Sequence, residues 1–280
     1  HVRLSEARSP SSSVGPIQLL QGSVLGPVFF IMYAADLQEL IEQHQLTPYG
    51  YADDTQVYGS CGPADAGGLA QKMSICIDEV SLWMKANRLQ LNQPKTEVVW
   101  FASSRRQHPS DSVRVGGTHV LPASTARDLG VHLDADISMK KHINMTVRAC
   151  FTALRRIRTL RRSLPRHALL TLIRALVVSK VDYCSSVLNG LPGRQLDRLQ
   201  SILNAAARTI FCTRKHEHIT PLLYELHSLK VEERIKFKLC VLTHCCLHGT
   251  APVYLAEALH RTTDVEASRR LRSAGATLLL

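Results

Sequence analysis

Residues 51–58 read Tyr-Ala-Asp-Asp-Thr-Gln-Val-Tyr, with two adjacent carboxylates, Asp53 and Asp54, between short apolar stretches. This pattern, closed by glycines at 59 and 62, predicts a short strand pair with the acids at a tight turn. Carboxylate oxygens at such a turn can hold Mg²⁺, a hard cation that prefers oxygen ligands. The alternative is a purely structural turn, because Asp also favours turns through local hydrogen bonds.

The flanking sequence predicts a mixture of helices and short strands. Apolar residues at helical spacing predict helices over 24–46 and 66–86. Alternating apolar residues predict strands near 89–91 and 98–101 around a turn, and a hairpin with a primed turn over 113–120. The first twenty residues contain a Ser/Pro-rich run, and we expect a loop or a frayed terminus there.

From about residue 138 the pattern is helical throughout. Helices are predicted at 138–162, 166–188, 193–211, 219–227 and 231–248. The predicted fold class is therefore α+β, with a mixed first part of about 135 residues and an all-helical remainder.

The positive charge of the chain is concentrated in one segment. The net charge is +11, and residues 137–181 contain eleven Lys and Arg and no Asp or Glu. Arg148, Arg155, Arg158 and Arg162 follow a helical spacing and form one stripe. A strongly basic helix beside an acidic first part suggests a surface that binds a polyanion, although a solvated helical face is the simpler alternative.

Cysteine usage and hydropathy limit the cellular locations, metal sites and membrane partners that we expect. The eight cysteines form no short-spaced disulfide framework, and no signal peptide opens the chain, so we expect reduced thiols and an intracellular location, in the nucleus or the cytoplasm. His244-Cys245-Cys246 continues an apolar helical pattern and lacks a CxxC pair, so we expect no zinc site. The longest near-apolar stretch, 24–35, is too short to span a membrane, and no membrane partner is expected.

Three motifs, in a fixed order, give these features a family context. They are Gln-Gly-Ser-Val-Leu-Gly-Pro at 21–27, Tyr-Ala-Asp-Asp at 51–54, and Trp83 followed by Asn-x-Leu-x-Leu-Asn-x-x-Lys-Thr-Glu at 87–97. In this order and spacing they resemble the reverse transcriptases of non-LTR (LINE-type) retrotransposons. The resemblance runs from about residue 18 to the end of the chain, with 128–131 similar to the hairpin that grips the primer and the later helices similar to the thumb and the C-terminal region.

The resemblance implies RNA-templated DNA synthesis by two-metal nucleotidyl transfer. It implies Asp53 and Asp54 as ligands of Mg²⁺, and Lys95 near the departing pyrophosphate. A turn-flanking surface lysine is the alternative for Lys95. The implied partners are an RNA template, a DNA primer and deoxynucleoside triphosphates. The residues implied near the template and the incoming nucleotide are Gln21, Gly22, Ser23, Tyr51 and Ala52.

The same resemblance divides the chain into four parts. Residues 1–20 are the frayed terminus, 21–135 the latter half of a polymerase palm, 136–211 a basic helical thumb, and 212–280 a helical C-terminal region. The residues expected to hold the nucleic-acid backbone by charge are Lys140, Lys141, Arg148, Arg155, Arg158 and Arg162.

Two departures from the family pattern lead to a second hypothesis. The family's first metal-binding aspartate lies on a strand upstream of the Gln-Gly turn, but the only acid before Asp36 is Glu6, in a setting without evident strand character. The fingers are also missing, and Gln18-Leu19-Leu20 replaces a Gly-Val-Pro turn. We therefore expect this chain to be inactive alone, and the alternative function is that of a non-catalytic, nucleic-acid-binding remnant of a retroelement.

Overall fold

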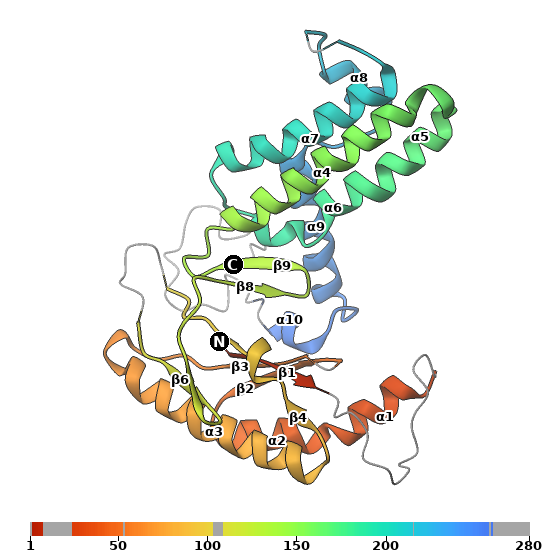
Figure 1. The fold of residues 1–280 in the computed structure, drawn as a ribbon. Helices are drawn as coiled ribbons and strands as arrows, with labels where there is room; N and C mark the ends of the chain where they lie inside the picture. The colour runs from red at the N-terminus through yellow and green to blue at the C-terminus, as the bar shows by residue number, and fades with distance from the viewer. Residues whose placement is uncertain are drawn as a thin grey trace. The chain divides into compact units, whose positions relative to one another are not determined.

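The computed structural model describes residues 2–7, 24–52, 54–102, 109–214, 216–257 and 259, with residues 2–7 described by their backbone (Figure 1). The chain divides into two compact units, residues 1–141 and residues 142–280. Each unit has its own core, and each is considered by itself below. The mixed composition of the first unit and the helical composition of the second confirm the α+β class.

A small antiparallel sheet organises the first unit. Its strands are β1 (Val2–Ala7), β2 (Thr47–Tyr51), β3 (Asp54–Tyr58), β4 (Gln90–Leu91) and β5 (Glu97–Val98). The order is β2-β3-β1-β4, and β5 also pairs with β1. Strand β1 is therefore central, with β3 on one side and both β4 and β5 on the other.

The prediction of a loop or frayed terminus over residues 1–20 is wrong for residues 2–7, which form β1. Val2 and Leu4 alternate with Arg3 and Ser5, but six alternating residues before a Ser/Pro-rich run are a weak local signal. The strand forms because its backbone groups find partners in β3, β4 and β5, which the chain reaches only much later. The remaining part of this prediction, residues 8–20, lies outside the described residues.

The described residues of the first unit form three helices, and two of them, the second and the third, pack against the sheet. The three helices are α1 (Gly26–Tyr33), α2 (Ala35–Gln43) and α3 (Ala66–Ala86), with single 3₁₀ turns η1 (Pro63–Asp65) and η2 (Gln93–Lys95). The predicted helix at 66–86 is confirmed, whereas the predicted helix at 24–46 is two helices that meet at Ala34. Only α2 has the alternation of buried and exposed positions that its pattern predicted, since no side chain of α1 is buried.

The core of the first unit lies between these helices and the sheet. Helix α3 supplies Met73, Ile77, Val80 and Met84, α2 supplies Leu37 and Ile41, and the strands supply Val57, Leu91 and Val98. Both tryptophans of the chain, Trp83 and Trp100, pack against this cluster. Tryptophan fluorescence therefore reports on the folding of the first unit alone.

Two further hairpins complete the first unit. Strands β6 (Val113–Val115) and β7 (Thr118–Val120) are joined at Gly116, whose positive φ of 60° confirms the predicted primed turn. Strands β8 (Thr125–Asp128) and β9 (Val131–Asp134) are joined by Leu129 and Gly130, which both have positive φ. This turn matches the right-handed twist of the strands that it connects.

The second unit is helical in all of its described residues outside turns and loops. Its elements are α4 (Lys140–Leu160, beginning at the unit boundary), η3 (Arg161–Ser163), α5 (Arg166–Ile173), a π-helical turn η4 (Arg174–Val178), α6 (Ser179–Asp182), η5 (Ser185–Leu188), α7 (Gly193–Phe211), α8 (Thr220–Glu225), α9 (Val231–Leu247) and α10 (Val253–Glu257). The predicted helices are confirmed, except that 166–188 is divided between α5, η4, α6 and η5. Periodicity alone cannot show this division, because each piece continues the same apolar stripe.

The predicted boundaries at 135/136 and 211/212 differ from the division at 141/142. Helices α8 and α9 both contact α7, so the residues after 211 that the structure describes continue the same unit. The first boundary differs because Lys141 remains bound to the first unit: its amide donates to Asp134 Oδ2 (3.2 Å) and its Nζ to Thr125 Oγ1 (2.5 Å). In the described part of the chain, no helix is both long and apolar enough to cross a membrane.

All eight cysteines are free thiols, and their burial predicts two reactivity classes. Burial raises the pKa of Cys76 to about 12 and that of Cys150 to about 11, whereas Cys61, Cys212 and Cys240 are exposed. The thiolate is the reactive form, so we expect an alkylating reagent at pH 8 to label the three exposed thiols and to leave Cys76 and Cys150 unmodified until denaturant is added. Mass spectrometry of the labelled peptides measures this, and rapid labelling of Cys76 in the folded chain would contradict the packing of α3.

Candidate functional site

The acidic pair lies at the β2–β3 hairpin. Tyr51 of β2 pairs with Asp54 of β3, and Ala52 follows Tyr51 with a positive φ of 53°, a value typical of tight hairpin connections. Asp53 itself lies outside the described residues.

Asp54 is the first residue of β3 and is half-buried. Its backbone pairs with Tyr51 of β2 and with Ser5 of β1. Glu6, the only acid of β1, is one residue further and pairs with Leu91 of β4. In this register Glu6 is one position out of line with Asp54, so the two acids are not directly opposed. The residue of β1 at the level of Asp54 is therefore a serine.

Two aromatic residues of β2 flank the turn on the side of Asp54. Tyr51 and Tyr49 are exposed, and Tyr49 meets the ring of Tyr58 edge to face, with 5.2 Å between the ring centroids. Tyr51 and Ala52, predicted near an incoming nucleotide, are thus at the exposed end of the hairpin. The other residues predicted there, Gln21, Gly22 and Ser23, lie outside the described residues.

A polar network fixes β3 to the β8–β9 hairpin. The Tyr58 hydroxyl donates to Gln56 Oε1, and Gln56 Nε2 donates to Asp128 Oδ1. Burial, the charge of Asp128 and the neighbouring Tyr49 raise the pKa of Tyr58 to about 12, so the phenol remains a neutral donor. Sequence reasoning missed this network, because Gln56 and Asp128 are 72 residues apart and no local pattern pairs them.

Replacing Asp128 by Ala tests this network. The change removes the charged acceptor of a buried amide, so we expect the free energy of unfolding of the first unit to fall by about 1.5–3 kcal/mol. Asp128→Asn keeps a carbonyl acceptor and should cost less. Denaturant titration followed by tryptophan fluorescence measures both variants. Equal midpoints for wild type and Asp128→Ala would show that the contact contributes nothing.

Lys95 is the last residue of η2, in the connection between β4 and β5. Its side chain is exposed, and its amide donates to the Asn92 carbonyl (3.0 Å), which also accepts from Thr96 Oγ1 (3.1 Å). Because β4 and β5 both pair with β1, and β1 pairs with β3, the turn of Lys95 and the strand of Asp54 are separated by two strand spacings, about 10 Å. The sheet therefore brings the turn of Lys95 into the neighbourhood of the acidic hairpin.

The predicted basic residues form an exposed row along α4 and η3. Lys140, Lys141, Arg148, Arg155, Arg158 and Arg162 are all exposed, and the buried face of α4 consists of His142, Ile143, Cys150, Leu154 and Ile157. Lys140 pairs with Asp136 (3.7 Å), and Arg158 Nε donates to Thr209 Oγ1 (3.1 Å). The arginines of α4 are thus presented to solvent, as the helical spacing predicted.

The described residues can be compared with the ligand clusters that metal ions require. Among them, no three His, Cys, Asp or Glu side chains lie close enough together to hold a metal ion. The pair Asp53–Asp54 is not covered by that statement, since Asp53 lies outside the described part. His244 and His248 stack with 3.9 Å between ring centroids in the last turn of α9 and at its C-cap.

Comparison with known proteins gives these features a family. Residues 12–133 match the family model described as reverse transcriptase (RNA-dependent DNA polymerase). The chain is 28% identical over 228 residues, 77% of its length, to the probable RNA-directed DNA polymerase from transposon BS of Drosophila melanogaster. It is 28% identical over 200 residues, 68% of its length, to the probable RNA-directed DNA polymerase from transposon X-element of the same organism.

These relatives are much longer, and the chain spans about a quarter of the length of each, 24% and 21%. No solved structure matches the chain significantly. The family match covers the acidic hairpin, η2 and the β8–β9 hairpin, and the curated relatives match over most of the chain. The chain is therefore similar to the reverse transcriptases of retrotransposons, and residues 12–133 are the part that the family model matches.

Proposed function

We propose that this chain is part of an RNA-directed DNA polymerase of a non-LTR retrotransposon. The observation that carries the proposal is the β2–β3 hairpin, in which Asp54 pairs with Tyr51 and begins β3, inside a segment that matches the reverse transcriptase family. The substrates would be an RNA template, a DNA primer and deoxynucleoside triphosphates. The first unit would correspond to the latter half of a palm and the helices from α4 to α7 to a thumb.

The donor chemistry of the hairpin fits a divalent cation. Asp54 is carried by a paired strand and directly follows Asp53 in the sequence, and both residues have hard carboxylate oxygens. Asp53 and Asp54 would hold Mg²⁺, which when bound would activate the attacking 3′-hydroxyl and stabilise the departing pyrophosphate.

Other residues of the chain would bind and orient the substrates. Lys95, from its exposed turn, would place a cation or a proton donor near the pyrophosphate. Gln21, Gly22, Ser23, Tyr51 and Ala52 would contact the template strand and the nucleotide. The exposed row on α4 would hold the template–primer backbone by charge, without reading its bases.

One observation favours a second candidate, nucleic-acid binding without catalysis. The register places Ser5, and not an acid, opposite Asp54 on the central strand. A two-metal site needs several carboxylates, and a missing ligand weakens the stabilisation of the leaving group. In this case the basic helices would bind RNA or DNA while the acidic hairpin remained without function.

A primer-extension assay separates the two candidates. The full chain is incubated with an RNA template, a labelled DNA primer, deoxynucleotides and Mg²⁺, with and without a chelator. Incorporation that depends on the metal supports the polymerase. Salt-sensitive binding of the template–primer without incorporation supports the binding remnant, and the absence of both would contradict the two candidates together.

A further inference from the structure

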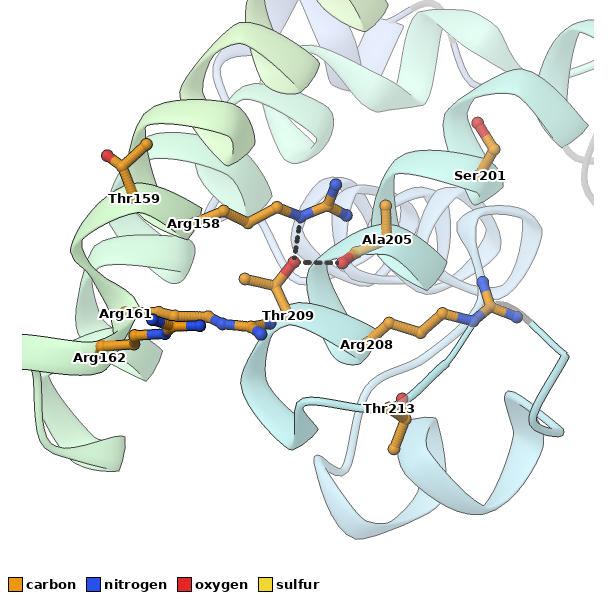
Figure 2. Close-up of a pocket in the computed structure, with 9 residues that line it drawn as sticks. All are labelled: Arg158, Thr159, Arg161, Arg162, Ser201, Ala205, Arg208, Thr209 and Thr213. Atoms are coloured by element: carbon orange, nitrogen blue, oxygen red, sulfur yellow. Dashed lines mark hydrogen bonds between the residues drawn. The ribbon is translucent and has the colours of Figure 1, made fainter.

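A basic pocket lies within the second unit, between the C-terminal end of α4 with η3 and the C-terminal half of α7. It has a volume of about 830 Å³. Its lining residues, shown in Figure 2, are Arg158, Thr159, Arg161, Arg162, Ser201, Ala205, Arg208, Thr209 and Thr213. In Figure 2, Arg158, Arg161 and Arg162 extend from the α4 side toward α7 and Thr209, whereas the Arg208 side chain extends from α7 away from α4.

The lining has the chemistry of an anion site. It contains four guanidinium groups and four hydroxyl groups, and no lining residue is acidic or aromatic. Guanidinium groups and hydroxyls donate hydrogen bonds to phosphate oxygens. Base stacking needs an aromatic surface, which this lining does not offer. The pocket thus suits a phosphate group and is poorly suited to a nucleobase or a metal ion.

Two buried polar atoms of the lining lack a partner. Of the four buried side-chain nitrogen and oxygen atoms without a hydrogen bond in the described part of the chain, Arg208 Nε and Thr213 Oγ1 both belong to this pocket. A buried donor without an acceptor is costly and calls for an explanation, such as a bound ion.

The arginines are positioned by neutral groups. Arg158 Nε donates to Thr209 Oγ1 (3.1 Å), and this buried hydroxyl donates to the Ala205 carbonyl (2.7 Å). Arg208 donates to the Glu217 carbonyl (3.4 Å). Among the described residues no carboxylate forms a salt bridge with any of the four arginines.

A structural alternative explains part of this arrangement. Arg158 and Arg208 occupy the last turns of α4 and α7, where a cation favours the helix dipole. This role would account for their presence at the two helix ends. It does not account for the buried Nε and hydroxyl without partners, and Arg161 and Arg162 follow the end of α4.

We propose that this pocket binds a phosphate group of a nucleic-acid backbone. The inference rests on the proposed function for the identity of the polymer. Arg158 and Arg162 belong both to the exposed row and to the pocket, so a strand that follows the row would deliver a phosphate into it. From Arg148 to Arg162 the row extends about 21 Å at 1.5 Å per residue, long enough for several phosphates. The pocket would hold the last of these phosphates, at a more buried position than the phosphates that contact the rest of the row.

Thermal unfolding of the full chain with pyrophosphate, at matched ionic strength, tests the site itself. Far-UV circular dichroism follows the helices of both units, most of which belong to the second, and tryptophan fluorescence follows the first unit alone and so separates its unfolding and general salt effects. We expect millimolar pyrophosphate to raise the midpoint of the second unit. The shift should be lost in R161Q/R208Q and in T213V. Because the Thr213 hydroxyl has no protein partner, T213V should keep the stability of the free protein.

Oligonucleotide binding identifies the source of the phosphate. For R161Q/R208Q we expect oligonucleotide binding to weaken by up to about tenfold. The slope of log K against log salt concentration should be lower by about one. R148Q/R155Q, which changes the row outside the pocket, should weaken oligonucleotide binding but keep the pyrophosphate shift. If R148Q/R155Q leaves oligonucleotide binding unchanged, the proposed binding of nucleic acid by the row is wrong. The proposal that the pocket binds phosphate would not be affected by that result.

Three outcomes would overturn the proposal. The first is the absence of a pyrophosphate shift in the wild type. The second is a shift of equal size in R161Q/R208Q and T213V, which indicates a non-specific effect. The third is a shift lost in the variants while their oligonucleotide binding equals that of the wild type, which would assign the pocket to a free phosphate and not to a backbone.

Discussion

Asp53→Ala is expected to abolish binding of divalent metal at the acidic hairpin and to reduce any primer extension at least about a hundredfold. Loss of a carboxylate ligand removes charge stabilisation worth several kcal/mol, and each 1.36 kcal/mol is a factor of ten in rate. Mn²⁺ accepts the same oxygen ligands as Mg²⁺, and its paramagnetism broadens nearby amide signals. We expect Mn²⁺ to broaden the amides of residues 51–55 in the wild type and to leave them sharp in the variant.

The control for this prediction is Asp36→Ala. Asp36 is an exposed carboxylate in the first turn of α2, so it matches Asp53 in charge but lies outside the hairpin. Its replacement should leave the Mn²⁺ broadening at 51–55 unchanged. Broadening that is equally strong in the wild type and in Asp53→Ala would contradict the hairpin as the metal site, whether or not the chain polymerises. The Mn²⁺ broadening thus tests the metal site even if the chain binds nucleic acid without catalysing polymerisation.

Reversing the charge of Arg148 and Arg155 to Glu is expected to weaken binding of template–primer about a hundredfold at low salt. Both side chains are exposed on α4, and neither lines the pocket. Each reversal removes one phosphate contact and adds a repulsive charge, so the dependence of log K on log salt should also fall by about two. Fluorescence anisotropy of a labelled duplex over a series of salt concentrations measures both quantities.

Arg194→Glu with Arg198→Glu is the matched control. Both are exposed on the first turns of α7, and their reversal changes the net charge by the same amount. We expect a much smaller loss of affinity, because these residues lie outside the α4 row. Equal losses in the two double variants would show that binding follows net charge alone, and the row would then have no specific role.

The helical part of this protein could be predicted closely from its sequence. The predicted helix at 193–211 coincides with α7, and that at 231–248 ends one residue beyond α9. Amphipathic periodicity and the surrounding Gly and Pro residues are local signals, and these helices bury the stripe that the period defines. The exposed arginines of α4 follow from the same period, since they occupy the side opposite the apolar arc.

The central strand could not be predicted in the same way. Residues 2–7 carry a short and ambiguous pattern, and their strand is stabilised by partners 49 to 96 residues later in the chain. The register that places Ser5 opposite Asp54 follows from this pairing. The resemblance to the family could therefore indicate the acidic pair, but not what stands beside it.

The sequence by itself determined the acidic doublet between short strands, the basic helix, and the motifs that resemble those of reverse transcriptases. Each of these depends on residues close together in the chain. The tertiary structure alone decided the place of β1 in the sheet, the contact of Gln56 with Asp128, and the pocket that joins Arg161 to Arg208. These depend on side chains that lie tens of residues apart and meet only because burial of the two cores brings their helices and strands together.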